Sequence, residues 1–171
     1  MLVDDEPANL RTLLRLFRDE YQVFAVGSGD QALNLLGQHD VAVMISDQRM
    51  PNMTGIQLMT KAVELRPQMV KILLTGYTDV EALIESINSG LVYRYVTKPW
   101  NNDDLKLTVK RAMDHYETIK ANHLIAMENG RLRSRLISLS EMALEAINDC
   151  NVAGCRSGNG ILVPTSQSML A

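Results

Sequence analysis

Short apolar runs alternate with helical stripes along the first two thirds of the chain, and this alternation limits the possible folds more than any other feature. The run from Val41 to Ile45 is continuously apolar, which is typical of a strand buried on both faces of a parallel sheet. Strand-like runs lie at 2–3, 21–26, 41–45, 70–74 and 92–96. Between them, at 8–20, 28–36, 56–65 and 80–87, apolar residues recur at the three- and four-residue spacing of one helix face. The pattern therefore predicts strands and helices in alternation, joined by short turns.

A right-handed crossover between parallel strands must be long enough to hold a helix, and the segments between these strands have that length. The pattern predicts an α/β fold of the flavodoxin-like type, a doubly wound (βα)5 parallel sheet in the order 2-1-3-4-5. In such sheets ligands bind beyond the carboxyl ends of the strands. The polar residues that follow the strands are Asp4, Asp5, Asp47, Thr75 and Lys98. We expect all of them at one edge of the sheet.

Three carboxylates at one edge repel one another unless a cation lies between them. Their oxygens suit a hard ion such as Mg²⁺, which also accepts a phosphate oxygen as a ligand. A carboxylate held in this way can attack a phosphoryl group, whose other oxygens then need donors such as the hydroxyl of Thr75 and the charge of Lys98. Singly, each residue is equally well explained as a helix cap, a strand-end residue or a solvated charge. Their coincidence at one edge favours a site for phosphoryl transfer.

Four segments that contain these residues resemble the signature segments of response-regulator receiver domains, which act in two-component signal transduction. The segments are Val3 to Glu6, Ser46 to Pro51, Leu74 to Gly76 and Thr97 to Pro99. They occur in the order and at the spacing of that family, and the resemblance covers about residues 2–116. It implies a protein that accepts a phosphoryl group from a sensor histidine kinase or a phosphotransfer protein.

The resemblance also implies a role for each acidic residue. Asp47 would be the phosphoacceptor. Asp5 and Asp47 would bind Mg²⁺, with Mn²⁺ as the alternative ion, together with the backbone carbonyl of Arg49, and Asp4 would act mainly through metal-bound water. Arg49 and Tyr77 would flank the path of the water that hydrolyses the phosphoryl group, and their bulk predicts a long-lived phosphoryl group.

By the same resemblance, Thr75 and Lys98 would bind the phosphoryl oxygens, and the peptide bond between Lys98 and Pro99 is a candidate for the cis form. Tyr95 lies where receivers carry an aromatic ring that turns inward when the threonine moves toward the phosphoryl group. Thr75 and Tyr95 are thus the predicted switch, and the face of the fourth helix, fifth strand and fifth helix would report the change to partners. The alternative for Tyr95 is an ordinary half-buried strand tyrosine.

The first strand is short for this family, because only Met1, Leu2 and Val3 precede the acidic pair. This strand is central in the predicted order, so its neighbours would lack ladder partners along part of their length. Either the start is trimmed or the helices compensate.

A long helix is predicted after the fifth strand. Residues at alternating four- and three-residue spacing are Leu105, Val109, Ala112, Tyr116, Ile119 and His123, followed beyond Gly130 by Leu132, Leu136, Leu139, Ala143 and Ala146. We predict that this helix pairs in parallel with a second copy of the chain through Leu105 to Ala146. The predicted organisation is a receiver domain at 1–118, a helical coiled-coil linker at 119–148 and a flexible tail at 149–171. A helix folded back on its own domain is the alternative.

Composition excludes several classes of partner. The formal net charge of −3 gives no broad basic field, so we expect no direct binding to nucleic acid. The apolar runs are far shorter than a bilayer requires and no signal peptide precedes them, which predicts a cytoplasmic protein without membrane contact. Cys150 and Cys155 are too few for a zinc site and are expected as reduced thiols.

Two other functions compete with the receiver hypothesis. Phosphotransferases of the haloacid-dehalogenase type carry their nucleophile after the first strand in an Asp-x-Asp spacing, which the adjacent Asp4 and Asp5 break. An adaptor that binds partners without phosphorylation would not need the complete acidic edge. We therefore expect a non-enzyme that assists only its own phosphorylation and dephosphorylation. It would signal to an effector domain or protein outside this chain.

Overall fold

The computed structural model describes residues 1–76 and 90–154. Its strands are β1 (Leu2–Val3), β2 (Ala25–Val26), β3 (Val43–Asp47), β4 (Val70–Thr75) and β5 (Arg94–Thr97). The helices of the described residues are α1 (Pro7–Phe17), α2 (Gly29–Gln38), α3 (Gly55–Leu65) and α5 (Asn102–Gly154). All neighbouring strands are parallel, in the order β2-β1-β3-β4-β5, which confirms the predicted flavodoxin-like sheet. The helix predicted at 80–87 lies outside the described residues.

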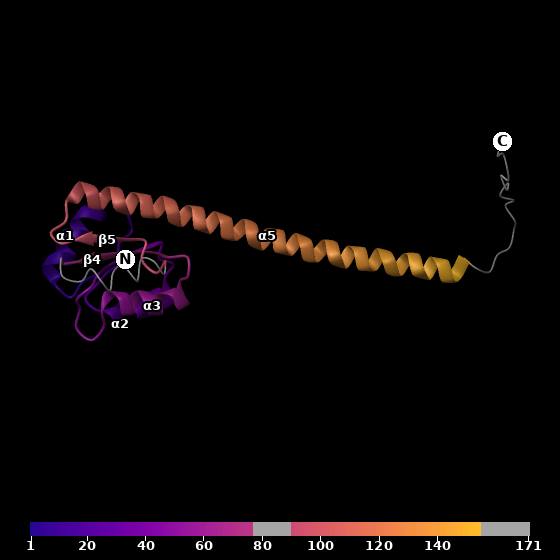
Figure 1. Ribbon diagram of the computed structural model, residues 1–171, viewed down its shortest axis with the longest axis horizontal. Coiled ribbons are helices and arrows are strands. Elements are labelled where there is room, and N and C mark those ends of the chain that lie inside the picture. Colours follow the sequence, from indigo (N-terminus) through magenta and orange to yellow (C-terminus); the bar gives the residue numbers. More distant parts are fainter. Residues whose placement is uncertain (77–89, 155–171) are drawn as a thin grey trace, which may run out of the picture. The chain divides into compact units, whose positions relative to one another are not determined.

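Helices cover both faces of the sheet (Figure 1). Met44 and Leu73 belong to a buried cluster with residues of α2 and α3. Their neighbours Ile45 and Ile72 belong to a second cluster with residues of α1 and the first part of α5. Successive side chains of a strand point to opposite faces, so continuously apolar strands supply two cores at once.

Two helices begin at residues that cap their free N–H groups. The Oγ of Ser28 accepts a hydrogen bond from the Gln31 N–H at 3.4 Å and thus caps α2. At α3, Thr54 and Gln57 form a capping box in which each side chain accepts from the other residue's backbone N–H. These caps fix where α2 and α3 start, directly beside the carboxyl ends of the strands.

The first strand is short, as predicted, and still pairs on both sides. Leu2 is aligned with Ala25 of β2 and Ile45 of β3. The Met1 carbonyl extends this contact by accepting a hydrogen bond from the Ile45 N–H at 2.9 Å. Leu2 and Val3 are almost fully buried, so the helices cover the strand on both faces. The acidic pair thus follows a strand in the middle of the sheet.

The predicted dimer seam is wrong over its first half. The residues Leu105, Val109, Ala112 and Tyr116 are buried in the core of their own domain, against Leu13 and Phe17 of α1. They cannot also contact a second copy. From Leu124 to Asp149 the helix is exposed throughout, and α5 continues to Gly154, beyond the predicted end at 148.

The chain divides into two compact units, at 1–123 and 124–171. The first contains the whole sheet, and the second contains the exposed part of α5. Within the ranges that the structure describes, no helix combines the length and the apolar character that a membrane span requires.

Candidate functional site

The five predicted site residues lie at the same edge of the sheet. Asp4 and Asp5 follow β1, Asp47 is the last residue of β3, Thr75 is the last residue of β4, and Lys98 follows β5. Because all five strands are parallel, their carboxyl ends meet along one side. The order of the strands places β1 beside β3, so the acidic residues of the two strands become neighbours.

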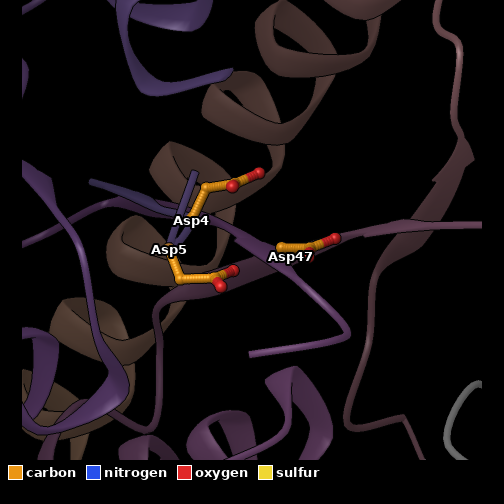
Figure 2. A group of neighbouring side chains, drawn as sticks. All are labelled: Asp4, Asp5 and Asp47. Atoms are coloured by element: carbon orange, nitrogen blue, oxygen red, sulfur yellow. The ribbon is translucent and has the colours of Figure 1, made fainter. Parts of the chain in front are cut away.

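The carboxylates of Asp4, Asp5 and Asp47 converge (Figure 2). One oxygen of each lies within 4.8 Å of the corresponding oxygens of the other two. Asp4 is fully buried and Asp47 is 8% exposed, whereas Asp5 is open to solvent. Hard oxygen ligands at this separation, with one open side for water or a phosphate oxygen, fit the requirements of Mg²⁺. These three residues are therefore the ones that would hold the ion.

The buried carboxylate of Asp4 is fixed by several donors. The Glu6 N–H donates to its Oδ1 at 2.9 Å, and the Asn9 amide lies 3.2 Å from Oδ1 and 3.1 Å from Oδ2. The same amide donates to Glu6 Oε2 at 3.2 Å. Sequence reasoning missed Asn9, although the residue lies on the first turn of a helix that begins beside the acidic pair. Its amide orients Asp4 and partly offsets the cost of burying a charge.

Lys98 connects the strands at the site. Its Nζ lies 2.7 Å from Asp47 Oδ1 and 3.1 Å from Asp4 Oδ2. Its backbone N–H donates to the Thr75 carbonyl at 2.7 Å, and the following peptide bond to Pro99 is cis, as predicted. The ammonium group is thereby held at the carboxylate that is the predicted phosphoacceptor.

For each partner of this ion pair, burial and the opposite charge shift the pKa in opposite directions. Burial raises the pKa of Asp47 above its usual value, and although the hydrogen bond and charge of Lys98 oppose this, the nearby charge of Asp4 adds to the rise. For Lys98, burial lowers the pKa, but the hydrogen bonds and charges of Asp47 and Asp4 outweigh it and the pKa is raised. Lys98 thus remains charged, while Asp47 retains a proton more readily than an exposed aspartate.

Thr75 occupies the predicted edge but its hydroxyl is engaged locally. The residue is 1% exposed, and its Oγ1 donates to the Gly76 carbonyl at 3.1 Å. Rotation about a single bond would free this hydroxyl to donate to another oxygen at the edge. Thr75 is aligned with Thr97 of β5. Its strand, β4, lies between β3, which carries Asp47, and β5, which precedes Lys98.

Gly55 allows α3 to start directly beside Asp47. A Cβ atom at this position would collide with the Asp47 carbonyl oxygen and with Leu73 Cδ1. The Gly55 N–H donates to the Gln48 carbonyl at 3.0 Å, and the Gln48 side chain accepts from the Ile56 N–H at 3.2 Å. The loop after the acceptor is therefore tied to the start of α3. The sequence pattern did not reveal the role of Gly55, because close approach of two backbones leaves no periodic signal.

The predicted switch and hydrolysis residues are placed only in part. Tyr95 is 46% exposed on β5, aligned with Leu73 of β4, so its ring points outward in this structure. Arg49 is exposed, and its backbone carbonyl remains a predicted metal ligand. Tyr77 and the helix predicted at 80–87 lie outside the described residues.

The arrangement supplies each component that phosphoryl transfer to a carboxylate requires. Asp47 offers a carboxylate at the edge of the sheet that could act as a nucleophile, the carboxylates of Asp4 and Asp5 complete an oxygen cluster that could hold a divalent cation, and Lys98 provides a fixed positive charge. A cation bound there would neutralise charge on the phosphoryl oxygens and favour the ionised form of Asp47. The described residues therefore bring Asp4, Asp5, Asp47 and Lys98 together and place Thr75 at the same edge of the sheet.

Comparisons with known proteins agree with this geometry. The family model of the response regulator receiver domain matches residues 1–110. The hydrogenase transcriptional regulatory protein HoxA of Cupriavidus necator is 39% identical over 114 residues, which cover 67% of this chain and 24% of that protein. The chain spans about a quarter of the length of such curated relatives.

Solved structures show the same fold. The chain is similar to the signal receiver domain of an HD domain-containing protein from Pseudomonas fluorescens Pf-5, with 33% identity, a TM-score of 0.65, and coverage of 68% of this chain and 94% of that one. It is also similar to an adenylate cyclase from Rhodopirellula baltica, with 31% identity, a TM-score of 0.71, and coverage of 72% and 93%. With the family model matching well over half of its residues, the chain belongs to the family of response regulator receiver domains.

Proposed function

We propose that the chain accepts a phosphoryl group on Asp47 from a sensor histidine kinase or a phosphotransfer protein, with Mg²⁺ held by the acidic cluster. A carboxylate oxygen of Asp47 attacks the phosphorus of a phosphohistidine. The new P–O bond forms as the P–N bond breaks, and the histidine nitrogen keeps the electron pair. The observation that carries this proposal is the convergence of three carboxylates with the Lys98 ammonium placed 2.7 Å from Asp47.

The proposal gives each remaining site residue a role. Lys98 stays beside Asp47 throughout, and once the phosphoryl group is attached its ammonium pairs with a phosphoryl oxygen. Thr75 turns its hydroxyl from the Gly76 carbonyl to another phosphoryl oxygen. Arg49 and Tyr77 follow Asp47 and Thr75 by two positions in the sequence, and by the resemblance to receivers their bulk would slow hydrolysis of the phosphoryl group by excluding water. The protein is thus a phosphoacceptor with a lasting modified state rather than an enzyme that turns over a separate substrate.

The signal leaves the site through β5. Thr75 and Tyr95 lie on the same face of the sheet, because Thr75 is aligned with Thr97 and side chains alternate along a strand. Movement of Thr75 toward the phosphoryl group gives the Tyr95 ring room to turn inward, which changes the surface of β5 and α5. An effector domain or protein, contacted by a homodimer of this chain, would detect that change. We propose the predicted division into a receiver at 1–118, a helical linker from 119 and a C-terminal tail, with the linker extended from its predicted end at 148 to the end of α5 at Gly154.

Phosphorylation by acetyl phosphate tests the proposal. With Mg²⁺ present, the wild-type protein should gain one acid-labile phosphoryl group, and the gain should disappear with a chelator and in Asp47→Asn, since an amide is not a nucleophile. Asp19→Asn is the matched control, because Asp19 is exposed and lies outside the site. Intact-protein and peptide mass spectrometry read the result. Full labelling of Asp47→Asn would show that another residue is the acceptor, and absence of labelling in the wild type would favour a phosphorylation-independent adaptor.

A further inference from the structure

The buried carboxylate of Asp4 accepts hydrogen bonds from three residues at once. Its Oδ1 accepts from the Glu6 N–H at 2.9 Å and from the Asn9 amide at 3.2 Å. Its Oδ2 accepts from the same amide at 3.1 Å and from the Lys98 ammonium at 3.1 Å. A carboxylate has about four lone-pair sites, so these contacts use its whole accepting capacity. Asp4 thus has no lone pair left with which to bind a cation directly.

Asn9 supplies the side-chain amide that holds Asp4 in this state. The residue is half-buried in the first turn of α1, and its amide lies across both oxygens of the Asp4 carboxylate. The amide nitrogen also donates to Glu6 Oε2 at 3.2 Å. Because an amide carries two N–H groups and no charge, it can serve both acidic residues at once. A neutral donor therefore lies between two carboxylates that would otherwise be free to turn toward a cation.

We propose that Asn9 is a positioning residue that withholds Asp4 and Glu6 from direct contact with the cation, and thereby makes the site selective for Mg²⁺ over Ca²⁺. The inference rests on the proposed function and concerns the choice of ion at the same site. With Asp4 withheld, Asp5 and Asp47 are the members of the cluster that can bind the ion directly, and Asp4 takes part through the water around it. Mg²⁺ keeps several waters and needs few carboxylates, whereas Ca²⁺ takes about six to eight oxygen ligands. Few direct ligands therefore favour the smaller ion.

Loss of the amide would change the number of available ligands. Asp4 would keep the Glu6 N–H as a fixed donor but would regain a lone pair on each oxygen. The Glu6 side chain, which is exposed at the start of α1, would lose the amide that holds it. Both carboxylates could then join those of Asp5 and Asp47 around one ion. A flexible site that is richer in oxygen ligands suits Ca²⁺ better than Mg²⁺.

Titration of the full-length, unphosphorylated chain with each ion tests the proposal. Asn9→Ala should raise the Kd for Mg²⁺ about tenfold, because the partner that orients an acidic residue of the site is lost. The same variant should lower the Kd for Ca²⁺ about threefold, because more oxygens become available. Asn34→Ala makes the same change at an exposed position of α2 and should leave both Kd values as they are. Isothermal titration calorimetry measures them. Equal weakening for both ions would mean that Asn9 only supports the local fold, and would overturn the proposal.

A second substitution sharpens the test, since Asn9→Asp removes the donor and also adds a carboxylate. Its Kd for Ca²⁺ should fall below that of Asn9→Ala, and circular dichroism checks that each variant keeps its helices. A Ca²⁺ affinity no higher than that of the wild type in both variants would reject the role of Asn9. Labelling of the wild type by acetyl phosphate is scored separately. A labelled chain whose ion preference does not depend on Asn9 contradicts only this inference, whereas an unlabelled chain that prefers Mg²⁺ through Asn9 contradicts only the proposed phosphoacceptor.

Discussion

The two parts of α5 have the same apolar spacing and opposite environments. From Leu105 to Tyr116 the apolar residues are buried against the sheet and α1 of their own domain, whereas from Ile125 to Ile147 they are exposed. From the spacing alone we predicted one continuous apolar seam. In the structure the first part of this seam is buried and the second part is exposed. Periodicity thus shows that a helix has an apolar face but not what covers that face.

Truncation of a leucine in each part should give the largest contrast. Leu105→Ala removes a fully buried side chain and should lower the free energy of unfolding of the receiver domain by about 2–5 kcal/mol. Leu136→Ala should change it by less than about 0.5 kcal/mol, since Leu136 is 66% exposed. Alanine is the better helix former in both cases, so helix propensity does not explain the difference.

Urea denaturation followed by the fluorescence of Trp100 measures both effects. Trp100 is the only tryptophan and packs against the core cluster that contains Leu105, so its signal reports on the receiver domain. Leu136→Ala should weaken dimerisation instead, which sedimentation detects. Equal losses of stability in the two variants would mean that the exposed part of α5 is covered by the domain in solution.

The features that were predicted correctly follow from burial on both faces of a sheet. Continuous apolar runs identified β3 and β4, and a parallel sheet with helical crossovers places the carboxyl ends of its strands, and with them Asp4, Asp47 and Lys98, at one edge. Three other features depend on contacts between distant segments. They are the Asn9 amide on Asp4, the close approach of Gly55 to Asp47, and the coverage of α5. Such contacts have no period along the chain, so patterns cannot reveal them.

Two glycines, one in the receiver domain and one in the exposed part of α5, offer a smaller and independent test. Gly37 in α2 and Gly130 in α5 both lie inside helices, and an added Cβ would have nothing within 4 Å at either position. Replacement by alanine should stabilise each helix by up to about 1 kcal/mol. For Gly37→Ala the gain should appear in the Trp100 transition. For Gly130→Ala it should appear only in the helical signal of circular dichroism. A shift of the Trp100 transition by Gly130→Ala would show that the two regions unfold as one unit.

The smallest expected effect concerns Tyr116, near the end of the buried part of α5. Tyr116 is buried, and its hydroxyl donates to the Asp40 carboxylate at 3.3 to 3.4 Å, at the loop before β3. Because the bond is long and the Asp40 side chain is two-thirds exposed, its contribution should be about 0.5 kcal/mol. Tyr116→Phe keeps the ring in the core and removes only this bond. Hydrogen exchange of the amides near Tyr116 should therefore become about twofold faster, with little change in global stability.

Tyr95→Phe removes a hydroxyl from an exposed ring and should leave exchange in α5 unchanged. If the two variants exchange alike, Asp40 does not hold the helix, and apolar packing alone determines where the covered part of α5 gives way to the exposed part.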